Sequence, residues 1–223
     1  MDKSIRQSFQ LEFHKERARE SNEWATDSLV HYVFNKAIFP DKKWNVVGQH
    51  PPTSYPEDRR RVDTKVELVN DNLQCITVLI GESKQHAASP SQIETCKMQA
   101  YIASRANLES SKQSALWVSI SIGTRWKLYI FRLSDDYLTN YYPETEDDFA
   151  SLDTDEITDF IEKFAEIRDH PIPPESFFKG RRPLPRPTDD EFGELDEEWR
   201  EPFTGPPLNL LLQPVDMPPA PAD

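Results

Sequence analysis

One run of residues constrains the fold of this chain more than any other. Residues 75–81, Cys-Ile-Thr-Val-Leu-Ile-Gly, are almost continuously apolar and rich in β-branched side chains, which is typical of a buried β-strand. Glu82, Ser83 and Lys84 follow directly. Side chains alternate along a strand, so Glu82 and Lys84 point to the same face. Because removing a carboxylate and an ammonium from water costs free energy, we expect this strand end to have a chemical role.

The segments around this strand predict an α/β fold with a central mixed β-sheet flanked by helices on both faces. A strand at 73–81, a helix at 90–106 and a strand at 115–122 have the spacing of a crossover connection, so the two strands can be parallel. Ser89 is placed to cap that helix and Pro90 to occupy its first turn. The remaining predicted elements are a helical lead-in at 1–20, a helix from Ser21 that ends before Pro40, strands at 44–48, 62–69 and 126–133, a hairpin turn at 70–72 and a helix at 153–168.

Several aromatic and aliphatic side chains are candidates for the core. Trp117 and Trp126 alternate with apolar neighbours along their predicted strands, so we expect both to be buried. In the lead-in, Phe9, Leu11 and Phe13 are candidates to dock on the body of the domain.

The C-terminal part of the chain differs in composition from the rest. Thirteen of the nineteen prolines lie in residues 171–223, and proline disrupts regular structure. Of the net charge of −13, −9 falls on residues 188–223, which leaves −4 for residues 1–187. We therefore interpret residues 1–170 as a folded domain and residues 171–223 as an extended, acidic, proline-rich arm. That arm can be a solubilising tail, a competitor of nucleic acid, or a docking segment through Leu208–Leu212.

The chain shows no signal for secretion or membrane insertion. No run approaches the ~18 apolar residues needed to span a membrane, and the N-terminal residues lack the apolar stretch of a secretory signal. Cys75 and Cys96 are too few for a disulfide framework and are expected to be reduced thiols in the core. These features predict an intracellular protein of the cytoplasm or nucleus.

Two acids and a lysine form the candidate site. Asp63 lies on the strand predicted at 62–69, and Glu82 follows it by nineteen positions. Mg²⁺, or Mn²⁺ in its place, prefers oxygen ligands and keeps several waters, so two carboxylates and the main-chain carbonyl of Ser83 suffice as protein ligands. Lys84 adds a cation where negative charge develops on a phosphate. An ion pair at a strand end is the alternative interpretation.

The layout of residues 20–135 resembles the PD-(D/E)XK nuclease superfamily, which has the restriction-endonuclease-like fold. Within it, the chain is most similar to the fungal branch, in which a helix carrying Glu-Trp and later Val-His precedes a strand reading Val-Asp. The corresponding residues here are Glu23-Trp24, Val30-His31 and Val62-Asp63, followed by Glu82-Ser83-Lys84. Val62 stands where many members have proline.

The resemblance implies a role for each matching residue. Asp63 and Glu82 would bind the metal, and Lys84 would orient the attacking water. Glu23 would hold a second metal or a metal-bound water, and Gln99 would face the site from the following helix, although the family's glutamine-tyrosine spacing is not reproduced. The alternative is that Glu23 only favours the helix dipole and that Gln99 is a solvated helix residue.

A basic run precedes the first acid of the site. Arg59, Arg60 and Arg61 can steer a polyanion toward Asp63, and a charged loop edge is the alternative. We therefore predict a Mg²⁺-dependent phosphodiesterase acting on nucleic acid. The rival interpretations are an enzyme of the same fold acting on a small molecule, favoured by the mildly acidic body, and a non-catalytic interaction protein.

Overall fold

The computed structural model describes residues 9–20, 22–55, 57–145, 147–154, 157–188 and 199. Within these residues a seven-stranded sheet has the strand order β1-β2-β3-β4-β5-β6, and β7 pairs with β5. Strands β3 and β4 are parallel, and the other pairs are antiparallel. The predicted mixed sheet is therefore confirmed. The strands are β1 (Trp44–Val47), β2 (Thr64–Val69), β3 (Cys75–Lys84), β4 (Ala115–Ile122), β5 (Arg125–Arg132), β6 (Thr139–Tyr142) and β7 (Ala150–Ser151).

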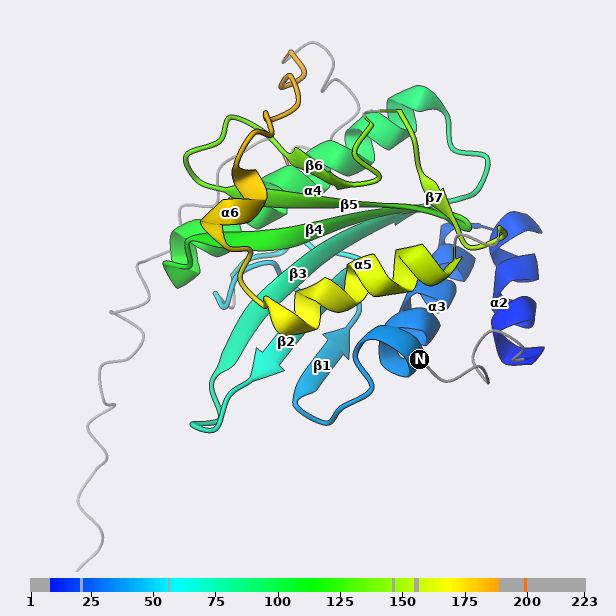
Figure 1. Ribbon diagram of the computed structural model, residues 1–223, viewed down its shortest axis with the longest axis horizontal. Helices are drawn as coiled ribbons and strands as arrows, with labels where there is room; N and C mark the ends of the chain where they lie inside the picture. The colour runs from blue at the N-terminus through cyan, green and yellow to red at the C-terminus, as the bar shows by residue number, and fades with distance from the viewer. Residues whose placement is uncertain are drawn as a thin grey trace, which may run out of the picture.

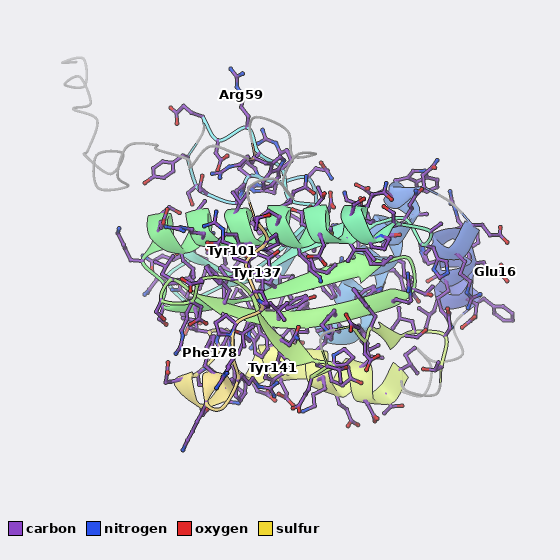
Figure 2. The ribbon with its side chains drawn as sticks, turned by 90° about the horizontal axis from the view of Figure 1, so that it is seen from above. Glu16, Arg59, Tyr101, Tyr137, Tyr141 and Phe178 are labelled. Carbon is purple, nitrogen blue, oxygen red and sulfur yellow. The ribbon has the colours of Figure 1, made fainter. Side chains whose placement is uncertain are left out.

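Helices cover both faces of the sheet, as Figure 2 shows when the molecule is seen from above. Helix α4 lies on one face, and α5 and α6 lie on the other (Figure 2). Helix α3 shares the apolar core of α5, and α2 packs beside α3 at one end of the molecule (Figure 1). The helices are α2 (Phe9–Glu20), α3 (Glu23–Val33), a π-helical turn η1 (Phe34–Ile38), α4 (Pro90–Ser111), α5 (Ile157–Asp169) and α6 (Glu175–Phe178).

The crossover between β3 and β4 follows the local signals of the sequence. Ser89 Oγ accepts a hydrogen bond from the Gln92 main-chain N–H, and the Gln92 side chain accepts one from the Ser89 N–H, so the start of α4 has a capping box. Helix α4 then runs to Ser111, five residues beyond the predicted end. Because β3 and β4 are parallel, their carboxyl ends lie at the same edge of the sheet.

The core contains most of the residues assigned to it. Trp117 and Trp126 are fully buried, and Cys96 is a buried thiol on α4, as predicted. Cys75 is a correction, because it lies at the exposed start of β3 beside the hairpin turn.

The helical lead-in is partly as expected. Leu11 is buried on the side of α2 that faces the body, but Phe9 and Phe13 are exposed. The prediction that these two rings dock on the domain is therefore wrong. The reason is helical geometry, because residues 9 and 13 lie four apart on a face that Leu11 does not share.

Part of the segment after residue 170 lies against the domain. Phe178, in α6, is buried in the core on the α5 side of the sheet, and the ring of its neighbour Phe177 lies 5.2 Å from that of Tyr141. Figure 2 labels Phe178 and Tyr141 on this side. Leu184 is buried in the core on the α4 side, and its N–H donates to the Leu138 carbonyl at 2.8 Å. The acidic stretch and Leu208–Leu212 lie outside the described residues, apart from the buried Trp199.

In the part of the chain that the structure describes, no helix combines the length and the apolar character that crossing a membrane requires.

Candidate active site

The candidate site lies where β2 begins and β3 ends. Thr64 and Gly81 are opposite each other in the antiparallel β2–β3 register, so Asp63 and Glu82 stand side by side one step further along. Strand β3 continues to Lys84, three residues beyond the predicted end, which places Glu82 and Lys84 within the strand itself. The two therefore share a face, as their alternation predicts.

Asp63 is held in place by two hydrogen bonds. Its Oδ2 accepts from the main-chain N–H of Ser83 at 2.8 Å, and its Oδ1 accepts from Nε2 of Gln49 at 2.8 Å. Gln49 has a left-handed backbone with φ of 51°, a conformation that costs free energy for a residue with a Cβ atom. The loop thus tolerates strain at the residue that orients Asp63.

Glu82 is the most deeply buried acid of the site, with 3% of its surface exposed. Burial raises its pKa well above the usual value, and the charge and hydrogen bonding of Asp63 raise it further, while Lys84 lowers it. Its Oε1 atom has no hydrogen-bond partner among the described residues. A buried carboxylate oxygen without a partner costs free energy. Binding of a cation or a proton at this atom would lower that cost.

Lys84 connects the strand to helix α3. Its Nζ donates to Oε2 of Glu23 at 3.1 Å, and its main-chain carbonyl accepts from Oγ1 of Thr26 at 3.0 Å. Burial favours a lower pKa, but the interactions with Cys96, Glu23 and Asp63 outweigh it and raise the Lys84 pKa to about 12. Lys84 is therefore a permanent cation at neutral pH.

Asp27 is a site residue that the sequence reasoning missed. It lies four residues after Glu23 on α3, so both carboxylates lie on one helix face. Burial raises the Asp27 pKa to about 7, with a further increase from Asp63 and a decrease from a hydrogen bond with Ser83. Its Oδ1 has no partner in the described chain. The Glu23-to-Asp27 spacing was the signal that could have found it.

Helix α4 contributes a thiol and an amide. Cys96 is buried, and burial raises its pKa well above the usual value, whereas Lys84 lowers it. Gln99 is half-buried one turn later, and its Oε1 has no partner among the described residues. The structure describes no hydrogen bond between Gln99 and the acids, so its role in the site stays a prediction.

The basic run before Asp63 does not act as one exposed unit. Arg60 is buried and forms a two-point ion pair with Asp58, with distances of 2.9 and 3.0 Å. A role of Arg60 in contacting substrate stays a prediction, and this ion pair is the arrangement that it would have to accommodate. Arg59 is exposed and points away from the body (Figure 2). Arg61 is also exposed but donates to the main-chain carbonyls of Asp58 and Arg60.

The chain after Lys84 is fixed against the β4–β5 turn. The Gly123 N–H donates to the Lys84 carbonyl at 3.1 Å. Gly123 has φ of 59°, and a Cβ atom there would lie 2.6 Å from the His86 side chain. Glycine at this turn therefore allows the close approach that holds the end of β3 in position.

The carboxylates of the site are possible ligands for a divalent metal. Among the described residues, no group of three His, Cys, Asp or Glu side chains is arranged as a complete metal site. Asp63 and Glu82 with one carbonyl nevertheless match the sparse protein ligation of Mg²⁺. The buried Oε1 of Glu82 and Oδ1 of Asp27 lack partners within the described residues, and both groups have raised pKa values in a cluster of like charge. A cation would relieve both conditions, so the residues fit the metal.

Comparison with known proteins found similarity in a solved structure alone. No protein-family model and no curated protein matches it. Among solved structures, the type IIG restriction endonuclease BpuSI is similar, with 14% sequence identity and a TM-score of 0.40 over 71% of this chain. The matched region spans 16% of that endonuclease.

Proposed function

We propose that the chain is a metal-dependent phosphodiesterase of the PD-(D/E)XK type that hydrolyses nucleic acid with Mg²⁺ or Mn²⁺. The observation that carries this proposal is the end of β3, where buried Glu82 lies beside Asp63 and Lys84 lies on the same face. A fold has no need of three buried or half-buried charges at one strand end, since each costs desolvation energy. The fungal-branch resemblance stays a prediction.

Each residue has a distinct task in this proposal. Asp63 and Glu82, with the Ser83 carbonyl, would hold the metal, which polarises phosphoryl oxygens and lowers the pKa of bound water. Gln49 and the Ser83 N–H orient the Asp63 carboxylate. Lys84, cationic because of its raised pKa, stabilises negative charge that develops on the phosphate.

The test is hydrolysis of single-stranded and double-stranded DNA and RNA with Mg²⁺ or Mn²⁺. Glu82→Gln and Lys84→Ala should each lower the rate by about 10²–10³-fold, because each removes a charge that acts on the transition state. Two ion-paired, exposed positions serve as matched controls: Glu109→Gln, paired with Arg105, and Lys163→Ala, paired with Glu166. Equal rates for wild type and Glu82→Gln would contradict the proposal.

A second candidate is a non-catalytic interaction protein. It is favoured by the internal pairing of the site, because both oxygens of Asp63 already accept hydrogen bonds and Lys84 is paired with Glu23. Calorimetric titration with Mn²⁺ separates the two. If Mn²⁺ binds to wild type with a saturable heat and Glu82→Gln abolishes that heat, the result supports the enzyme. If Mn²⁺ does not bind to wild type, the result supports the interaction protein.

A further inference from the structure

An exposed aromatic surface lies next to the candidate site and has no part in the chemistry above. Phe13 on α2 and Trp24 on α3 are 51% and 50% exposed. The guanidinium carbon of Arg17 lies 5.3 Å from the Phe13 ring centroid and 4.3 Å from that of Trp24. Phe13, Arg17 and Trp24 thus form a continuous surface, which we call the aromatic platform.

The platform is supported by α2, which lies beside α3 (Figure 1). Leu11 and Ala18 are buried on the opposite side of α2, and a hydrogen bond of 3.1 Å joins His14 to Ser28 across the two helices. The exposed rings are therefore presented by an anchored helix pair. Exposed rings on a fixed support lose little conformational freedom when a ligand binds.

The platform and the site share helix α3. Trp24 follows Glu23, whose carboxylate pairs with Lys84 at 3.1 Å, and consecutive Cα atoms are ~3.8 Å apart. A polynucleotide with a phosphate near Lys84 would thus bring a neighbouring nucleotide to Trp24. Of the described carboxylates, none forms a salt bridge with Arg17, so its charge is available to an anionic ligand.

The chemistry of the platform favours a nucleobase over a protein partner. Two half-exposed rings offer far less surface than the ~800 Å² per partner of a stable protein interface. Charged residues are depleted from the centres of such interfaces, yet here a guanidinium lies between the rings. Aromatic rings and an arginine plane are the groups on which unpaired bases stack.

We propose that Phe13, Arg17 and Trp24 bind an unpaired base, so that the substrate of the site is single-stranded nucleic acid. This inference rests on the proposed function and specifies its substrate class. In a duplex the bases are stacked inside and cannot reach a flat external surface without unpairing.

The experiment uses the full-length protein in EDTA, so that no hydrolysis occurs. Trp24 is the exposed tryptophan, because Trp44, Trp117, Trp126 and Trp199 are buried. A short single-stranded DNA should therefore quench tryptophan fluorescence by stacking on Trp24, and Trp24→Phe should abolish the quenching but retain binding within a few-fold. Trp24→Ala should weaken single-strand binding, measured by anisotropy of a labelled strand, by about 5- to 150-fold.

The controls separate this inference from its alternatives. Leu73→Ala removes another exposed apolar side chain, 84% exposed at the far hairpin turn (Figure 1), and should leave binding unchanged. The inference is overturned if Trp24→Ala binds single strands as wild type does. It is also overturned if wild type sediments as a dimer that Trp24→Ala converts to monomer, because a second copy then covers the platform. Intact binding without Mg²⁺-dependent cleavage would refute the proposed hydrolysis and leave the platform supported.

Discussion

At the scale of single residues, the site is a compact group of acids next to one cation. The charge of Asp63 raises the pKa of both Asp27 and Glu82, and the charge of Lys84 lowers both. In the absence of a bound cation, such a group disfavours full ionisation. The same interactions that prepare the site for a metal therefore reduce the stability of the metal-free protein at neutral pH.

This charge cluster predicts how stability depends on pH. The Asp27 pKa is raised to about 7, against about 4 in an unfolded chain, so the folded state binds the extra proton between these values. The contribution of Asp27 to stability therefore falls as pH rises from about 4 to about 7. Asp27→Asn removes this dependence and should stabilise the metal-free protein at pH ~8 by on the order of 1–2 kcal/mol. Thermal unfolding in EDTA measures the effect.

The control for this prediction is Asp41→Asn, an exposed turn residue, which should change little at any pH. Added Mg²⁺ should narrow the difference between Asp27→Asn and wild type, because a cation favours the ionised cluster. The same loss of stability with pH in Asp27→Asn as in wild type would show that Asp27 is not the titrating group.

At the scale of elements, the site depends on the hydrogen bonds that hold the end of β3 in position. The Lys84 carbonyl receives hydrogen bonds from Thr26 on α3 and from Gly123 in the β4–β5 turn. Two elements distant in sequence thus fix the end of β3. A change in the turn should alter the site without touching an acid or the lysine.

Gly123→Ala tests how much the β4–β5 turn contributes to holding the end of β3. Alanine at φ of 59° is strained, and its Cβ would clash with His86 at 2.6 Å, so we expect a loss of about 2–4 kcal/mol. Gly180→Ala is the matched control, because Gly180 has φ of 79° but a Cβ atom there would meet no other atom within 4 Å, and it should cost only about 1–2 kcal/mol. Thermal unfolding gives both values, and equal losses would show that the contact with His86 is unimportant.

At the scale of the whole molecule, the folded unit includes residues beyond 170. Phe178 is buried in the core on the α5 side, and Arg132 of β5 lies over its ring at 4.4 Å. Leu184 joins the core on the α4 side. The segment therefore contacts both layers before it reaches the acidic stretch.

Phe178→Ala tests whether this segment stabilises the domain. Removing a buried phenylalanine leaves a cavity and should lower the free energy of unfolding by about 3–5 kcal/mol. Ile172→Ala, at a 39% exposed position in the same segment, should change it by less than about 0.5–1 kcal/mol. Denaturant unfolding compares the two, and a small effect of Phe178→Ala would mean that the domain folds without the segment.

Local signals in the sequence determined the order of the elements from α3 to β5, the α4 cap, the buried strand and the same-face placement of Glu82 and Lys84, but not β6, β7 or α6. Each depends on neighbours within one helix or strand, so periodicity and capping chemistry suffice to predict it. Only the tertiary structure decided that Asp27 and Gln49 join Asp63, that Arg60 turns inward to Asp58, and that Trp24 and Arg17 stack. These contacts connect segments far apart in sequence or set a side-chain direction, and the packing of the whole chain determines both.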